Sequence, residues 1–198
     1  MPRAMEKEDL IRIREAFVAA ALRAWEASYD GVEIHGAHGY LLNQFYSPLT
    51  NKRTDAYTGS TLEGRTRYLR EVIQAVRAAV SADFVVTLRL GGGDYMEGGS
   101  QPEELPQAVE LLQQEGLDGI SFSGGMCIFF RPGHPEPGYF AELSQAAKET
   151  ARIPVLLTGG IETGNQAEHF LATGQADLIG LGRAALKDPQ VFRKILEE

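Results

Sequence analysis

Apolar positions along the chain switch repeatedly between two spacings. A spacing of three to four residues, which predicts amphipathic helices, is found in segments 7–28, 61–80, 102–115, 139–150 and 163–173. Short continuous apolar runs, which predict strands, stand at 31–34, 84–90, 118–122, 155–158 and 177–181. Helical segments then continue from the last run to the end of the chain. The pattern therefore predicts one helix followed by five strand–helix units.

This regular alternation favours a parallel sheet with helices packed outside it. A doubly wound sheet is one alternative, but no Gly-x-Gly-x-x-Gly fingerprint follows the first strand. A barrel is favoured because barrel active sites are built after the strand ends. The unusual residues stand at such places, at His35–Tyr40, Arg89–Asp94, Ser123–Gly125, Gly159-Gly160 and Gly182-Arg183. We predict an α/β fold, a partial TIM (β/α)8 barrel of about five parallel strands, as a single domain over residues 1–198.

Composition narrows the classes of partner. The chain of 198 residues is 43% hydrophobic and 23% charged, as is ordinary for a soluble globular protein. A formal net charge of −8 without a basic run argues against nucleic acid. No apolar run is long enough to span a membrane, and the acidic start does not suit a signal peptide. The single cysteine, Cys127, cannot form an internal disulfide or a multi-thiolate metal site. We therefore expect a cytoplasmic protein with no metal.

The clearest candidate chemistry follows the first strand, in the run from His35 to Tyr40. Two histidines at a strand end, His35 and His38, can both donate hydrogen bonds to one oxygen that gains negative charge in a reaction. One such donor is typically worth about 2.7–4 kcal/mol. The phenol of Tyr40 can deliver a proton at neutral pH. A metal-binding pair or purely structural histidines are the alternatives.

Two further features at strand ends suit an anionic cofactor. Arg89 would bring a permanent positive charge to the mouth of a barrel, and a salt bridge to Glu33 is the alternative. Gly159-Gly160 and Gly182-Arg183 follow the last two strands. Backbone amides in such turns bind phosphate, and the phosphate site of a barrel commonly follows its seventh and eighth strands. Simple turn glycines are the alternative here.

In the same order, these segments resemble the old yellow enzyme family of NADH:flavin oxidoreductases. The match is dense from Asp30 to Arg65, and it includes the whole run from Gly31 to Leu42. It resumes at Arg89-Leu90, Gly98-Gly99, Thr158–Ile161, Gly180–Arg183 and Asp188-Pro189. The resemblance thus spans nearly the whole chain.

The resemblance implies an FMN-containing barrel that takes hydride from NADH or NADPH and reduces the C=C bond of a small enone or enal. It implies that His35 and His38 bind the carbonyl oxygen of the substrate and that Tyr40 donates a proton to the α-carbon. Arg89 matches the residue that faces the N1/O2 edge of the flavin. The phosphate-binding turns of the family match Gly159, Gly160, Gly182 and Arg183.

The five predicted strands correspond to strands 4 to 8 of that family, and the first three have no counterpart. An open sheet would expose two edges and an apolar face, which favours association. We therefore expect a homo-oligomer or pairing with a separate N-terminal half-barrel. The alternative hypothesis is a flavin-free half-barrel that serves as an interaction unit or is a gene fragment. A sugar-phosphate isomerase or aldolase is disfavoured because no lysine stands at a strand end.

Overall fold

A computed structural model describes residues 3–197, so the ends of the predicted domain, Met1, Pro2 and Glu198, lie outside the described residues. One parallel sheet organises the chain. Its five strands are β1 (Gly31–Gly36), β2 (Val85–Gly93), β3 (Gly119–Gly124), β4 (Val155–Thr158) and β5 (Leu178–Gly180). Each strand pairs in parallel with the next one along the chain, which leaves β1 and β5 at the edges.

The strand order distinguishes the two predicted architectures. A doubly wound sheet reverses its order at a switch point, whereas a barrel adds each strand beside the previous one. The observed order, β1-β2-β3-β4-β5, has no reversal. The prediction of an α/β fold with about five parallel barrel strands is therefore confirmed.

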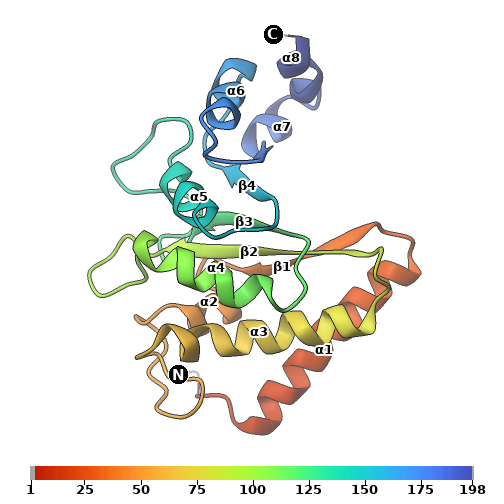
Figure 1. Ribbon diagram of the computed structural model, residues 1–198, viewed down its shortest axis with the longest axis vertical. Helices are drawn as coiled ribbons and strands as arrows, with labels where there is room; N and C mark the ends of the chain where they lie inside the picture. Colours follow the sequence, from red (N-terminus) through yellow and green to blue (C-terminus); the bar gives the residue numbers. More distant parts are fainter. Residues whose placement is uncertain (1–2, 198) are drawn as a thin grey trace.

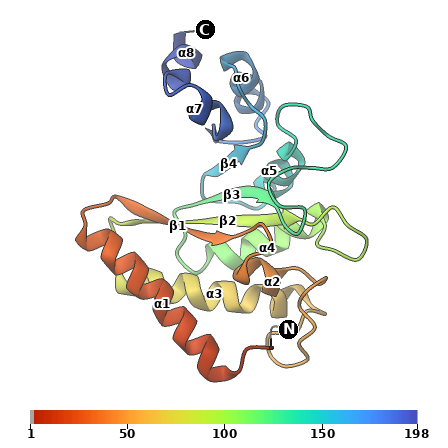
Figure 2. The ribbon, with the colours of Figure 1, turned by 180° about the vertical axis from the view of Figure 1, so that it is seen from behind.

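The helices follow the sheet in chain order. They are α1 (Lys7–Glu26), α2 (Leu41–Tyr46), α3 (Leu62–Ala79), α4 (Leu105–Gln113), α5 (Ala141–Lys148), α6 (Gly164–Ala172), α7 (Arg183–Lys187) and α8 (Val191–Glu197). Neighbours α1 and α3, α3 and α4, and α4 and α5 pack on one another and form a layer outside the sheet (Figure 1). Seen from behind, α6 to α8 cover the end of the sheet beyond β4 (Figure 2). Within residues 3–197, no helix combines the length and apolar character needed to cross a membrane.

The hydrophobic core lies between this helix layer and the outer face of the sheet. On β2 that face buries its side chains completely, at Val86, Leu88 and Leu90. The inner face is mixed, because the exposed apolar side chains of Val85 and Leu178 share it with the polar pair Glu33 and Ser121. The expected exposed apolar face is thus present at Val85 and Leu178 but is interrupted by polar side chains.

Three elements differ from the prediction. Helix α2 was not predicted, because six residues are too few to reveal a helical period. Strand β2 continues to Gly93 through three glycines, whose weak strand propensity hides the extension. The segment from Pro102 begins with a 3-10 turn, Pro102–Glu104, and becomes α-helical at Leu105. Gly174, which follows α6 with a φ of 72°, ends that helix in the left-handed conformation typical of a C-terminal cap.

Candidate active site

The end of β1 brings together the three residues that the sequence pattern singled out. The ring centre of His35 lies 5.0 Å from that of His38 and 5.4 Å from that of Tyr40. Both histidines are partly buried, whereas Tyr40 is 64% exposed. Two imidazoles and a phenol therefore share one accessible surface at the carboxyl end of the sheet.

The turn that carries His38 has an uncommon backbone conformation. His38 has a φ of 60° and Gly39 a φ of 73°, both in the left-handed region that non-glycine residues rarely enter. The Gly39 amide donates to Oδ1 of Asn43 at 2.7 Å, and Nε2 of Gln44 donates to the Gly39 carbonyl at 2.8 Å. Both partners belong to α2. The helix that was not predicted therefore holds the turn in place.

Arg89 lies beside the histidines. It is the β2 residue in register with His35, and its Nη2 donates to Oγ of Ser123 at 3.3 Å. The same Oγ lies 2.7 Å from Nε2 of His38. The alternative salt bridge to Glu33 is not formed in the described part of the chain, where Glu33 accepts a hydrogen bond from Ser121. Arg89 therefore connects to the histidine cluster.

A cavity of about 330 Å³ opens next to Arg89 at the carboxyl ends of β3, β4 and β5. All the residues predicted to bind a cofactor line it, namely Arg89, Gly159, Gly160, Gly182 and Arg183. Gly159 has a φ of 128° and Gly160 a φ of 70°, which side chains rarely permit. A Cβ at Gly182 would meet nothing within 4 Å. The turn at Gly182 therefore leaves its backbone open to the cavity.

Tyr139 is a cavity residue that the sequence placed only at the start of a helix. Its hydroxyl donates to the Phe129 carbonyl at 3.1 Å and accepts from Nη2 of Arg183 at 2.9 Å. Its ring lies 3.0 Å from the position that a Cβ would take at Gly159 or Gly160. Tyr139 thus joins the two glycine turns and holds the Arg183 guanidinium at the cavity. Tyr139 and Arg183 are 44 positions apart, so no local pattern could reveal the contact.

Comparison with known proteins supports the resemblance. Residues 1–198 match the model of the NADH:flavin oxidoreductase / NADH oxidase family. The chain belongs to this family. It is 42% identical over 188 residues to an NADPH dehydrogenase of Halalkalibacterium halodurans, across 95% of this chain and 54% of that protein. It is 36% identical over 200 residues to an NADH oxidase of Thermoanaerobacter brockii, across 99% of this chain and 31% of that protein.

A comparison with solved structures also finds oxidoreductases that resemble this chain. A 2-naphthoyl-CoA reductase in complex with 2-naphthoyl-CoA matches with a TM-score of 0.89 and 29% identity, across 98% of this chain and 30% of that one. The chain therefore spans about half the length of the NADPH dehydrogenase and about a third of the NADH oxidase. The family description names flavin and NADH, and the relatives are named for NADH and NADPH, which agrees with the predicted FMN cofactor and nicotinamide reductant.

The residues of this family member fit FMN. The Arg89 Nε is buried and has no hydrogen-bond partner among the described residues, and buried N–H groups are rarely left in that state. An acceptor on a ligand would satisfy it. Two glycine turns and the Arg183 guanidinium also line the same cavity, and groups of these kinds bind phosphate. The donor set therefore suits an anionic, phosphate-bearing cofactor.

Burial and nearby positive charge keep both histidines neutral. Burial, then the charge of Arg89, lowers the pKa of His35. Burial, then Arg89 and His35, lowers the pKa of His38 to about 4. At pH 7 each ring therefore carries one N–H, which suits hydrogen bonding to an oxygen better than proton transfer.

We expect a His38→Gln variant to be less sensitive to acid than the wild type. The folded pKa of His38 is about 4, below its ordinary value of 6.5, so the unfolded chain binds a proton in this range that the folded chain does not. Stability conferred at higher pH is thus lost as the pH falls from 6.5 towards 4. Urea unfolding at pH 7 and at about pH 5 measures the loss for each protein. Equal losses of unfolding free energy in the wild type and the variant would contradict a lowered pKa for His38.

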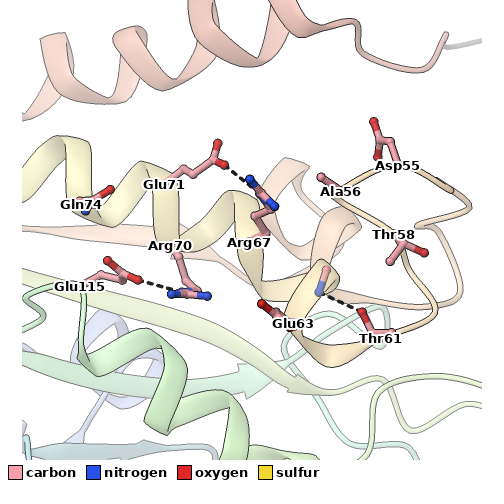
Figure 3. A pocket seen from close by; sticks show the side chains of 11 residues that line it. Asp55, Ala56, Thr58, Thr61, Glu63, Arg67, Arg70, Glu71, Gln74 and Glu115 are labelled. Atoms are coloured by element: carbon pink, nitrogen blue, oxygen red, sulfur yellow. Dashed lines mark hydrogen bonds and ion pairs between the residues drawn. The ribbon is translucent and has the colours of Figure 1, made fainter.

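A second hollow, of about 540 Å³, lies outside the sheet where α3 begins (Figure 3). It is lined mainly by polar side chains. Arg67 binds Glu71 at 3.2 Å, and Arg70 binds Glu115 at 2.8 Å. Both guanidinium groups are paired with carboxylates, and none of the predicted site residues lines this hollow, so the cavity beside Arg89 is the candidate site.

Proposed function

We propose that this chain carries the catalytic residues of an FMN-dependent ene-reductase. The reaction is reduction of the C=C bond of α,β-unsaturated carbonyl compounds, with hydride that NADH or NADPH supplies through the flavin. The observation that carries the proposal is the cluster of two neutral imidazoles and one exposed phenol beside the Arg89 cavity. Residues 1–198 act as a single partial-barrel domain in this proposal.

The cavity residues hold FMN in this proposal. The Arg89 guanidinium, charged in any environment, donates to the electron-rich edge of the flavin. The amides of the glycine turns and the Arg183 guanidinium bind the phosphate. When bound, FMN would supply the hydride transfer from the reduced nicotinamide to the β-carbon of the substrate.

The residues at the end of β1 act on the substrate. His35 and His38 donate hydrogen bonds to the carbonyl oxygen and stabilise the negative charge that it gains as hydride reaches the β-carbon. Tyr40 then donates its phenolic proton to the α-carbon. The alkene thus gains one hydride and one proton.

The proposal also covers assembly and location. Strands β1 and β5 are sheet edges, which present unpaired backbone groups and favour pairing with a second copy or a separate N-terminal half-barrel. A free, buried thiol such as Cys127 suits the reducing cytoplasm.

The first test is retention of the cofactor. We expect the purified chain to bind added FMN and to keep its yellow colour through gel filtration. A chain that refuses added FMN would overturn the proposal for this chain and favour the flavin-free interaction unit.

We expect Arg183→Ala to weaken FMN binding by about 10- to 100-fold, because hydrogen bonds to charged groups contribute roughly 1.5–3 kcal/mol. Quenching of flavin fluorescence measures the Kd. Arg193→Ala is the matched control, because Arg193 also lies in the C-terminal segment but is paired with Glu197 outside the cavity. Equal Kd values for the two variants would contradict a phosphate role for Arg183.

A further inference from the structure

Ser123 lies between the substrate side and the cofactor side of the proposed site. It belongs to β3, and its side chain is completely buried. Its Oγ lies 2.7 Å from Nε2 of His38 and accepts a hydrogen bond from Nη2 of Arg89 at 3.3 Å. One hydroxyl therefore contacts a proposed oxyanion donor and the proposed cofactor-binding cation.

The chemistry of the three groups fixes the direction of these hydrogen bonds. A serine hydroxyl has one proton to donate and two lone pairs, whereas a guanidinium only donates. The Ser123 proton therefore needs an acceptor other than Arg89. Among residues 3–197 the acceptor within hydrogen-bond distance is Nε2 of His38. Because buried hydroxyls are rarely left without a partner, this arrangement favours donation from Ser123 to an Nε2 of His38 that carries no proton.

We propose that Ser123 is a positioning residue that fixes the tautomer of His38 with its single proton on Nδ1. Nδ1 has no hydrogen-bond partner among the described residues, so its N–H is free to meet an oxygen of the substrate. The inference rests on the proposed function, because that function gives the free N–H its role. A second tautomer, with the proton on Nε2, would turn a lone pair towards the substrate oxygen and repel it.

The surroundings of His38 leave its ring with a single proton, so the tautomer decides which nitrogen can donate a hydrogen bond. Burial and Arg89 hold the pKa of His38 at about 4, so the ring has one proton and not two at neutral pH. Arg89 also orients Ser123, because its donated hydrogen bond occupies one lone pair and leaves the hydroxyl proton for the imidazole. The guanidinium that we assign to the cofactor thus also organises the substrate side.

Nuclear magnetic resonance of the chain labelled with 15N-histidine at pH 7 tests the tautomer directly. The chain has four histidines, and the His38 signal is identified by its loss in His38→Gln. We expect the wild type to show a protonated Nδ1 and an unprotonated Nε2. We expect Ser123→Ala to move the proton to Nε2 in a large share of molecules, and Ser123→Thr, which keeps the hydroxyl, to restore the wild-type pattern.

Ser121→Ala is the matched control. Ser121 lies two residues earlier on the same face of β3, and its hydroxyl donates to Glu33 instead. A general disturbance of the strand would affect both variants, whereas the proposed role predicts an unchanged His38 tautomer in Ser121→Ala. A wild-type His38 protonated on Nε2, or a Ser123→Ala variant with the wild-type tautomer, would overturn the inference. If Ser123→Ala does not fold, the wild-type spectrum decides.

Ligand binding separates this inference from the proposed function. A phenol titrated into the FMN-loaded chain presents an oxygen like that of the enolate. We expect Ser123→Ala to bind it about tenfold more weakly, the loss of roughly one hydrogen bond, and Ser121→Ala to bind as the wild type does. Absence of binding to the wild type would count against the proposed function and leave the tautomer result standing. Equal binding by wild type and Ser123→Ala would overturn the positioning role.

Discussion

Replacing Asp94 with alanine is expected to lower the free energy of unfolding by about 3–5 kcal/mol. Three hydrogen-bond donors then lose their acceptor, which costs roughly 1–3 kcal/mol for each donor, and water that enters the site offsets part of this cost. Asp94 is completely buried. Its Oδ2 accepts from Oγ of Ser47 at 2.6 Å and from the Ser100 amide at 2.9 Å, and its Oδ1 accepts from the Met126 amide at 2.8 Å. Among the described residues, no other carboxylate accepts hydrogen bonds from these three donors.

The three donors come from three different loops, which explains the size of the expected effect. Ser47 follows α2 and the His38 turn, Ser100 belongs to the loop after β2, and Met126 lies in the loop after β3. One carboxylate thus ties together the loops that surround the site. A Cβ at Gly125 would collide with Oδ1 of Asp94, so the packing leaves room only for glycine beside it. Loss of Asp94 should therefore loosen the turn that carries His38 as well as the fold.

Urea unfolding measures the effect, with Asp83→Ala as the control because Asp83 is exposed before β2. Asp94→Asn should fall between the wild type and Asp94→Ala, because the amide keeps one acceptor oxygen but turns an N–H₂ group towards a donor. A difference of under about 1 kcal/mol between Asp94→Ala and Asp83→Ala would contradict the role given to the carboxylate.

The fold could be predicted because its signals are local. Strand β4 matches its predicted bounds at both ends, Val155 and Thr158. The predicted helix starts at Thr61 and Thr163 are the N-caps of α3 and α6, where each threonine side chain accepts from a backbone amide in the first turn. Helix α2 escaped prediction because tertiary contacts, and not a period of its own, hold six residues helical.

The candidate site likewise contains residues that a local sequence motif could reveal and residues that only long-range contacts bring together. His35, His38 and Tyr40 lie within six positions, so a motif could reveal them. Ser123 stood in a strand-end segment, but its contact with His38 joins residues 85 positions apart, and the Ser47–Asp94 contact joins residues 47 apart. Serine and aspartate are common in loops and carry no signal alone. The residues that orient the site therefore became visible only when the fold brought them together.

Tyr40→Phe is expected to slow alkene reduction by about 10²- to 10⁴-fold, the usual contribution of a positioned proton donor. The change keeps the ring that packs beside His35 and removes only the hydroxyl. The Tyr40 side chain is mostly exposed, and its hydroxyl has no hydrogen-bond partner within residues 3–197. We therefore expect little change in stability, so a lower rate reports on the chemistry.

Stopped-flow absorbance of the FMN-loaded chain separates the two half-reactions. Reduction of the bound flavin by NADPH requires no proton from Tyr40, so its rate should match that of the wild type. Reoxidation by an enone requires a proton at the α-carbon, so its rate should fall. Tyr29→Phe serves as the control, because Tyr29 is as exposed as Tyr40 but stands just before β1, at the opposite end of the strand.

The ratio of the two rates decides the role of Tyr40. A loss confined to reoxidation identifies the phenol as the proton donor, because a hydroxyl that only shaped the binding surface would also change how the nicotinamide reaches the flavin. Equal losses in both half-reactions would contradict the proton-donor role and assign Tyr40 to binding. A normal reoxidation rate would mean that solvent protonates the α-carbon at this exposed site, and the two histidines would then be the catalytic groups that remain.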